Sequence, residues 1–279
     1  GLAAYLTQEI FPPLAPPPYA AIEVTVLSER KPVFLFHEVL RDVQVVGKLF
    51  AGDNATLEQA WMAAEREYFN LSMLRGRCGM GSGVCRVVAP LGTTKELGAL
   101  LITERASGTL LDHFIQKAAS GEGSEELFEN LGLLARFFAR LHRSSQSRRG
   151  ISPRLLQWYL WSITDSLSED CVPASELNDI EESGRAWAGR SDRFEGDSEV
   201  IVHGDATPTN FLFGDHEVTG IDLERMKWAD RCWDLGFMAA ELKHHFLWRS
   251  GDGWAAEPFI GRFLWEYAAH CGDDQFFQA

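Results

Sequence analysis

The chain has 279 residues, of which 46% are hydrophobic and 24% charged, a composition that fits a globular protein of one large or two smaller domains. Its formal net charge of −14 argues against a nucleic acid as a partner, because phosphate backbones select basic surfaces. No apolar run reaches the length of a membrane span, and the scattered cysteines form no CxxC pair, so we expect reduced thiols in a cytoplasmic protein.

The N-terminal part of the chain predicts a small β-rich unit with one helix. A short helical stretch and a proline-rich lead-in occupy residues 1–19, where proline removes the N–H groups that regular structure needs. Three β-rich runs separated by polar breaks then predict a meander, at residues 21–28, 33–40 and 43–50. Residues 56–74 place apolar side chains at helical spacing. Two further β-rich runs are expected to complete the sheet, at residues 84–92 and 98–105.

Beyond this unit the pattern changes to amphipathic helices with short strands between residues 200 and 222. The helices are expected at residues 109–120, 126–145, 152–167, 174–190, 232–248 and 257–270. The sequence therefore predicts an α+β fold with two lobes. A small antiparallel β lobe with one helix comprises residues 1–103, residues 104–108 form a hinge, and residues 109–279 form a larger, mainly helical lobe. A cleft between two lobes is where ligand sites usually form.

One segment, HGDATPTNFLFGDHEVTGIDLER, gathers polar side chains around a short apolar hairpin that begins after His203. Asp205 and Asn210 lie in the loop after a strand, and the hairpin returns the chain to Asp222. Hard oxygen ligands at this spacing suit Mg²⁺, which prefers one or two protein ligands plus substrate phosphates. Asp205 is placed to accept the proton of an attacking hydroxyl group. The alternative is an ordinary polar hairpin without a function. The ordered set of residues argues against it, because phosphoryl transfer needs a base and metal ligands in this arrangement.

Two motifs of this segment, HGDATPTN and IDLE, resemble the His-x-Asp-x-x-x-x-Asn and Asp-x-Glu/Asp motifs of the aminoglycoside phosphotransferase and choline kinase-like small-molecule kinases. Members of that family share the two-lobed fold of protein kinases, so the resemblance implies this fold and a phosphotransferase activity. It implies Asp205 as the catalytic base, with Asn210 and Asp222 as metal ligands that also hold the nucleotide. It further implies that Asp234, in DRCWDLGF, braces the catalytic loop and that His203 supports it.

The small lobe contains the matching nucleotide-binding residues. Lys48 ends the third strand, where the family keeps a lysine for the α- and β-phosphates; the alternative is a solvated edge lysine. Glu67 is the expected partner of Lys48, because it is followed by leucines four and seven places on, as the family's glutamate is by apolar residues, whereas the rival Glu65 points about 200° away around the helix. The run LLITERASGTLLDHF resembles the family's hinge, so the backbone around Glu104 is expected to contact adenine. The implied cofactors are ATP or GTP together with Mg²⁺.

Two spacings favour a small hydroxylated substrate over a protein substrate. A helical insert of about 50 residues lies between His142 and His203, where protein kinases connect the long helix to the catalytic loop almost at once. About a dozen residues separate Asp222 from Asp234, which leaves no room for an activation loop and peptide platform. In this family the insert and final helices wall the acceptor pocket, and they are rich in tryptophan. A core position is the alternative for each of Trp158, Trp161, Trp187, Trp248, Trp254 and Trp265.

One feature departs from the family pattern. The expected glycine-rich phosphate loop between the first two strands is replaced by LSERKPVF, in which Arg30 or Lys31 would supply positive charge. The glycines of GMGSG, residues 79–83, follow a helix and precede a strand, which is the wrong order for a phosphate cradle, so this segment is predicted to be a connector. The sequence therefore predicts an ATP- and Mg²⁺-dependent small-molecule phosphotransferase. The alternatives are a catalytically weak pseudokinase that binds nucleotide or a partner, and a sugar or lipopolysaccharide-core kinase.

Overall fold

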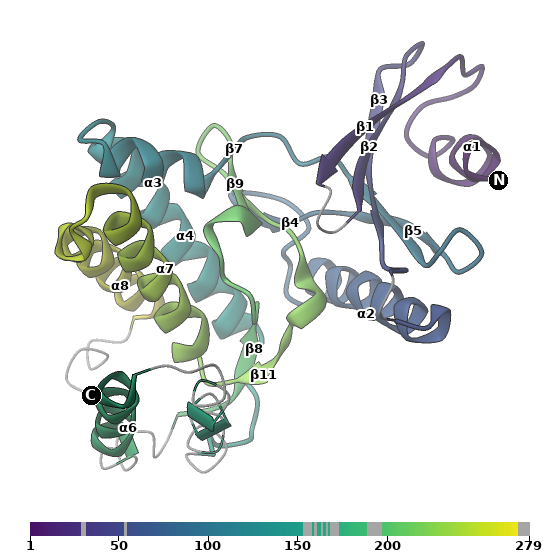
Figure 1. Cartoon of the computed structure of the whole chain (residues 1–279). Coiled ribbons are helices and arrows are strands. Elements are labelled where there is room, and N and C mark those ends of the chain that lie inside the picture. The colour runs from purple at the N-terminus through teal and green to yellow at the C-terminus, as the bar shows by residue number, and fades with distance from the viewer. Residues whose placement is uncertain are drawn as a thin grey trace.

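The computed structural model shows a small β lobe and a larger helical lobe, connected by the chain that follows β6 (Figure 1). It describes residues 1–28, 32–52, 55–152, 158, 161–162, 164–165, 167, 173–188 and 197–272. Several sequence predictions lie outside the described residues, namely Arg30, Lys31, most of the helix at residues 152–167 and the side chain of Trp187. The two-lobed arrangement that the sequence predicts is present.

The small lobe is built on a five-stranded antiparallel sheet with the order β1-β2-β3-β6-β5. Its strands are β1 (Ile22–Ser28), β2 (Val33–Glu38), β3 (Val43–Leu49), β5 (Pro90–Thr94) and β6 (Leu100–Glu104). The predicted meander is confirmed as β1 to β3. The N-terminal turns α1 (Leu2–Tyr5) and η1 (Leu6–Ile10) pack Leu6 and Ile10 against Phe36, Val45 and Ile102 of the sheet.

Helix α2 (Leu57–Gly76) is the single long helix of the small lobe, as predicted. It begins with a capping box, in which Gln59 N donates to Thr56 Oγ1 at 3.3 Å and Thr56 N donates to Gln59 Oε1 at 2.9 Å. Leu71 and Leu74 pack against the core of the large lobe, and Ala64 packs under the sheet. Because Glu67 lies on the same buried face, the helix directs a carboxylate into the protein.

The predicted strand at residues 84–92 does not run as one strand of the small sheet, and that prediction is wrong. Its first part is β4 (Cys85–Val87), which pairs in parallel with β10 (Val218–Gly220) of the large lobe. Only β5 joins the small sheet. Pro90 has no N–H to continue a ladder, and the buried side chains of Cys85 and Val87 belong to the core of the large lobe. The chain therefore enters the large lobe once before the hinge.

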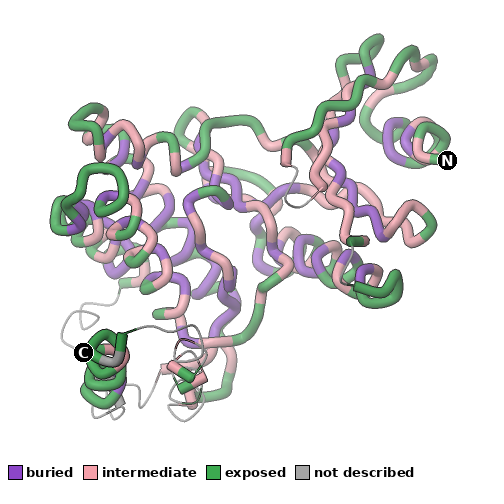
Figure 2. Tube along the Cα trace, viewed as in Figure 1, coloured by how far each residue is buried: buried purple, intermediate pink, exposed green. Residues whose placement is uncertain are grey.

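The large lobe is a bundle of helices around short strands. Its helices are α3 (Leu111–Ala119), α4 (Ser124–Ser144), α6 (Ala174–Ala188), α7 (Cys232–Ser250) and α8 (Glu257–Cys271). Its remaining strands are β7 (Thr109–Leu110), β8 (Val200–Val202), β9 (Phe211–Phe213) and β11 (Lys227–Ala229). Buried residues line α4 and the central strands, while the outer surface of α6 is exposed (Figure 2). None of the helices in the described residues has the length and apolarity of a membrane-crossing segment.

Candidate active site

The β9–β10 hairpin sets the position of two predicted site residues. Phe211 pairs with Gly220, and Ile221 N donates to Asn210 O at 3.0 Å. Asn210 closes the turn η3 (Pro208–Asn210) directly before β9, and Asp222 follows Ile221. The hairpin therefore brings Asn210 and Asp222 to the same end of the paired strands, as the sequence predicts.

Asp234 is fully buried and holds the start of the loop of residues 203–210, which the family resemblance implies is the catalytic loop. Its Oδ2 accepts a hydrogen bond from His203 N at 2.7 Å, and its Oδ1 accepts one from Gly204 N at 3.0 Å. His142 Nε2 lies 3.2 Å from Asp234 Oδ2, and His142 Nδ1 lies 2.9 Å from the Tyr267 hydroxyl. A buried carboxylate with this many donors keeps one geometry, so α7, α4 and α8 together fix the loop.

His203 ties the catalytic loop to the segment that carries Asp222. Its Nε2 lies 2.9 Å from Ile221 O, which makes Nε2 the protonated nitrogen because a carbonyl only accepts. The ring also packs against Phe211 at a centroid distance of 5.2 Å. These contacts show how His203 supports the loop without reaching a reacting group.

The Asp205 carboxylate has no hydrogen-bond or ion-pair partner among the residues that the structure describes. The main-chain oxygen of Asp205 instead accepts from Asn210 Nδ2 at 2.9 Å and from Thr207 N at 2.8 Å. The Asn210 amide, oriented by this network, keeps its Oδ1 as the atom that can bind a metal ion. The loop thus presents the carboxylate of Asp205 and the Oδ1 of Asn210 to a ligand.

Lys48 lies at the centre of three carboxylates. Its Nζ is 2.8 Å from Glu67 Oε2, 2.5 Å from Asp222 Oδ1 and 2.8 Å from Glu224 Oε2. Glu67 is buried, whereas the rival Glu65 is exposed, so the glutamate expected from the sequence is the one that contacts the lysine. Glu224 was not among the predicted site residues, although it is the glutamate of the IDLE motif that carries the resemblance.

The electrostatics of this cluster follow from its burial. Burial acts to lower the pKa of Lys48, but the carboxylates of Glu67, Asp222 and Glu224 outweigh it and raise that pKa above its usual value. Burial raises the pKa of Glu67, while Lys48 acts to lower it. Lys48 is therefore a permanent cation at neutral pH, held against Glu67 in the middle of α2.

The donor set fits a divalent cation. One oxygen from each of Glu67, Asp222 and Glu224 lies within 4.8 Å of the other two. Three carboxylates and one ammonium leave a charge of −2, and carboxylate oxygens are the ligands that Mg²⁺ prefers. The side chains of Asp222 and Glu224 are 22% and 17% exposed, against 4% for Glu67. Asp222 and Glu224 are thus open to a ligand, while Glu67 anchors Lys48.

Glu104 is the last residue of β6 and lies directly before the predicted hinge, where its side chain contacts the segment between β4 and β5. Its Oε1 accepts hydrogen bonds from Arg86 Nη1 at 3.0 Å and from Ala89 N at 2.8 Å. The carboxylate is therefore engaged within the protein. A contact between the backbone at Glu104 and adenine stays a prediction.

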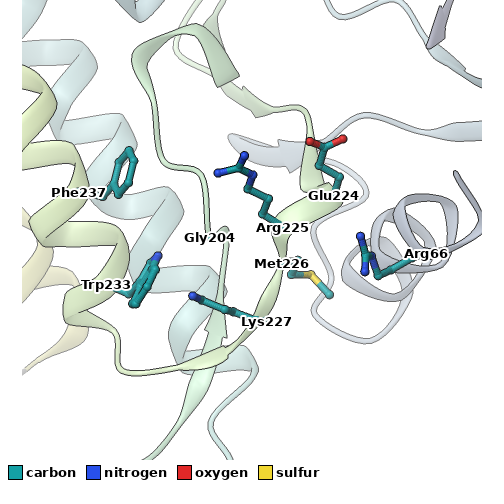
Figure 3. A pocket seen from close by; sticks show the side chains of 8 residues that line it. All are labelled: Arg66, Gly204, Glu224, Arg225, Met226, Lys227, Trp233 and Phe237. Carbon is teal, nitrogen blue, oxygen red and sulfur yellow. The ribbon is translucent and has the colours of Figure 1, made fainter. Parts of the chain in front are cut away.

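A hollow of about 430 Å³ opens beside the catalytic loop (Figure 3). It is lined by Arg66, Gly204, Glu224, Arg225, Met226, Lys227, Trp233 and Phe237. The described tryptophans named from the sequence do not line it. Their core alternative is wrong, because they are 61–73% exposed, namely Trp158, Trp161, Trp248, Trp254 and Trp265. That they wall the acceptor pocket stays a prediction. On α7 and α8 the tryptophans lie on the exposed face of the helix. The opposite face is buried and carries Phe246, Phe259 and Phe263.

Gly204 is required where the catalytic loop meets the segment after Asp222. Its φ is +83°, and an added Cβ would lie 2.2 Å from Arg225 O. We expect Gly204→Ala to lower the free energy of unfolding and to reduce phosphoryl transfer about 100-fold, since a misplacement of about 1 Å has that effect. Gly121→Ala is the matched control, because Gly121 has a φ of +87° with nothing within 4 Å of its Cβ position. The control should lose only the about 1–2 kcal/mol of the left-handed conformation in thermal unfolding. Equal losses in both variants would show that the Arg225 contact is unimportant.

Comparisons with known proteins identify the family and the fold of the chain. The family model described as "Phosphotransferase enzyme family" matches residues 61–270. A comparison of the sequence with curated proteins finds no match. Among solved structures, a glucosamine kinase is similar with a TM-score of 0.58 and 16% identity, covering 99% of this chain and 73% of that one.

Two further structures are similar. An ethanolamine kinase of Plasmodium vivax has a TM-score of 0.50 and 14% identity, covering 91% of this chain and 74% of that one. The streptomycin-ATP-APH(2")-IIa ternary complex has a TM-score of 0.51 and 14% identity, covering 94% of this chain and 92% of that one. These likenesses confirm the two-lobed, protein-kinase-like fold that the sequence predicts.

Proposed function

The chain belongs to the phosphotransferase enzyme family and is a small-molecule kinase, and from this premise we propose that it moves the γ-phosphate of ATP to a hydroxyl group of a small molecule with the help of Mg²⁺. The observation that carries the proposal is the cluster in which Lys48 contacts Glu67, Asp222 and Glu224 at one end of the β9–β10 hairpin. It sets the phosphate-binding cation beside the carboxylates suited to a metal ion.

The roles of the residues follow from their contacts. Glu67 holds Lys48 so that its ammonium can meet the α- and β-phosphates of the nucleotide. Asp222, Glu224 and the Oδ1 of Asn210 are the oxygens that would hold the metal ion. When bound, Mg²⁺ neutralises charge on the phosphates and on the leaving oxygen.

Asp205 supplies the acid–base step. Its carboxylate, which has no partner among the described residues, takes the proton of the acceptor hydroxyl. The acceptor oxygen then forms a bond to the γ-phosphorus as the bond to the β–γ bridging oxygen breaks and ADP leaves. The loop that carries Asp205 is fixed by Asp234 and by the Asn210 amide, so the base is held in place before the acceptor binds.

The nucleotide role of Lys48 can be separated from its structural role with two variants. Lys48→Met keeps an unbranched side chain of similar size but leaves the buried Glu67 without its cation, which costs about 3–5 kcal/mol of stability. The double variant Lys48→Met/Glu67→Gln removes both charges, so it should recover much of that stability. Both variants should bind nucleotide roughly 10- to 100-fold more weakly in calorimetric titration, the range for a lost charged hydrogen bond. A double variant that binds nucleotide like the wild type would remove Lys48 from the phosphate site.

The direct test of the function is a screen for ADP release. The protein is supplied with ATP or GTP, with Mg²⁺ or with EDTA, and with single hydroxylated compounds. The proposal expects ADP release that needs both the metal ion and one acceptor. A protein that binds Mg²⁺-ATP tightly and yields ADP with none of them would instead be the catalytically weak nucleotide-binding module.

A further inference from the structure

We propose that the acceptor carries an anionic group, and that the hollow beside the catalytic loop binds this group. The inference rests on the proposed function, which it extends to the chemical class of the substrate. The hollow begins at Gly204, the neighbour of Asp205, and ends on α7 at Trp233 and Phe237 (Figure 3). A molecule that places one hydroxyl group at Asp205 can extend past Gly204 into this hollow.

The charges around the hollow are predominantly positive. Arg66 comes from α2, and Arg225 and Lys227 come from the segment after Asp222. The single acidic lining residue, Glu224, is already 2.8 Å from Lys48. The guanidinium groups of Arg66 and Arg225 have no ion-pair partner among the described residues. Three cations around one hollow are notable in a chain with a net charge of −14, because the average surface of such a protein is acidic.

The opposite wall gives the carbon skeleton of the acceptor an apolar surface. The side chains of Arg225 and Lys227 both extend toward α7 (Figure 3). Lys227 Nζ lies 3.1 Å from the centroid of the Trp233 ring, a cation–π contact that holds the ammonium at the wall. Phe237 and Met226 add apolar lining. Convergent charges over an aromatic wall are typical of sites that orient a small polar ligand.

This chemistry disfavours a cationic acceptor. Glucosamine and ethanolamine, which two of the similar structures name, carry an amino group that is protonated at neutral pH. An ammonium group in this hollow would meet three like charges and one carboxylate that already contacts Lys48. A carboxylate or phosphate group beside α7 would instead meet the ammonium group of Lys227 and the guanidinium group of Arg225, which binds such oxygens through paired hydrogen bonds. Because all three cations are exposed, the preference should weaken as salt is added.

The test uses hydroxylated compounds matched in skeleton and opposite in charge. The pairs are glucuronate against glucosamine and glycolate against ethanolamine, each titrated by calorimetry with and without Mg²⁺ and a non-hydrolysable ATP analogue. Transfer is followed separately as ADP release with ATP. We expect the anion of each pair to bind at least tenfold more tightly than the amine, and Arg225→Glu to weaken it roughly 10- to 100-fold. Arg148→Glu is the matched control, because Arg148 is exposed and does not line the hollow.

The outcomes separate this inference from the proposed function. Equal or tighter binding of the amines, with Mg²⁺-dependent ADP release, would overturn the anionic acceptor and leave the kinase assignment standing. Failure of all four compounds to bind would also overturn the inference. Anion binding that falls in Arg225→Glu but not in Arg148→Glu would support it. If no nucleotide binds to the wild type, the proposed function fails, while the titrations without nucleotide still decide the charge preference.

Discussion

Asp205→Asn should reduce phosphoryl transfer to the acceptor by roughly 10²- to 10⁴-fold, the loss expected when a general base is removed. The substitution keeps the shape of the side chain and the main-chain oxygen that accepts from Asn210 and Thr207. It removes only the carboxylate that takes the hydroxyl proton. Because Asp205 makes no contact with Lys48, nucleotide should still bind. A nucleotide titration and a turnover assay on the two proteins measure both effects.

The control for the Asp205 variant is Asp215→Asn, which removes one carboxylate from the exposed turn between β9 and β10. It should leave transfer unchanged. Equal acceptor turnover in wild type and Asp205→Asn would remove Asp205 from the mechanism. Loss of nucleotide binding together with transfer would instead place Asp205 in the nucleotide site.

Asp222→Asn should abolish the contribution of Mg²⁺ to nucleotide binding. Asparagine suits the test better than alanine, because Asp222 has a φ of +59° and asparagine tolerates this left-handed conformation. The substitution removes the most exposed of the three carboxylates around Lys48 and reduces the local charge from −2 to −1. The ratio of nucleotide dissociation constants in EDTA and in Mg²⁺ should fall roughly 100-fold toward unity.

The comparison for the Asp222 variant is its own nucleotide binding in EDTA. This metal-free binding should persist, because Lys48 remains and loses one competing carboxylate. Thermal unfolding checks that the chain stays folded. A variant that keeps the full Mg²⁺ effect would move the metal site away from Asp222.

Local spacing explains what the sequence could predict. The family's spacing of apolar residues after the glutamate, together with helical periodicity, separated Glu67 from Glu65, and the short gap between Asn210 and Asp222 matched the hairpin that joins them. Glu224, which contacts Lys48, was missed although it is the second acid of the recognised IDLE motif. The signal for it was the motif itself.

Contacts between distant segments explain what the sequence could not predict. The run at residues 84–92 is β-rich throughout and resembles one strand, but its first part pairs with β10, far along the chain. The basic hollow combines Arg66 of α2 with Arg225 and Lys227, whose proximity follows only from the packing of the two lobes. The exposed tryptophans of α7 and α8 were misjudged because composition does not tell which face of a helix is covered.

The most direct test of the central claim is ³¹P NMR of the wild-type protein with Mg²⁺-ATP and the acceptor panel, including glucuronate and glycolate, beside Asp205→Asn. The spectrum distinguishes a new phosphate ester from the inorganic phosphate of simple hydrolysis. We predict a phosphate monoester that forms only with Mg²⁺ and one hydroxylated acceptor, and that is lost in Asp205→Asn. Tight binding of Mg²⁺-ATP with no phosphate ester from any hydroxylated acceptor would contradict the account.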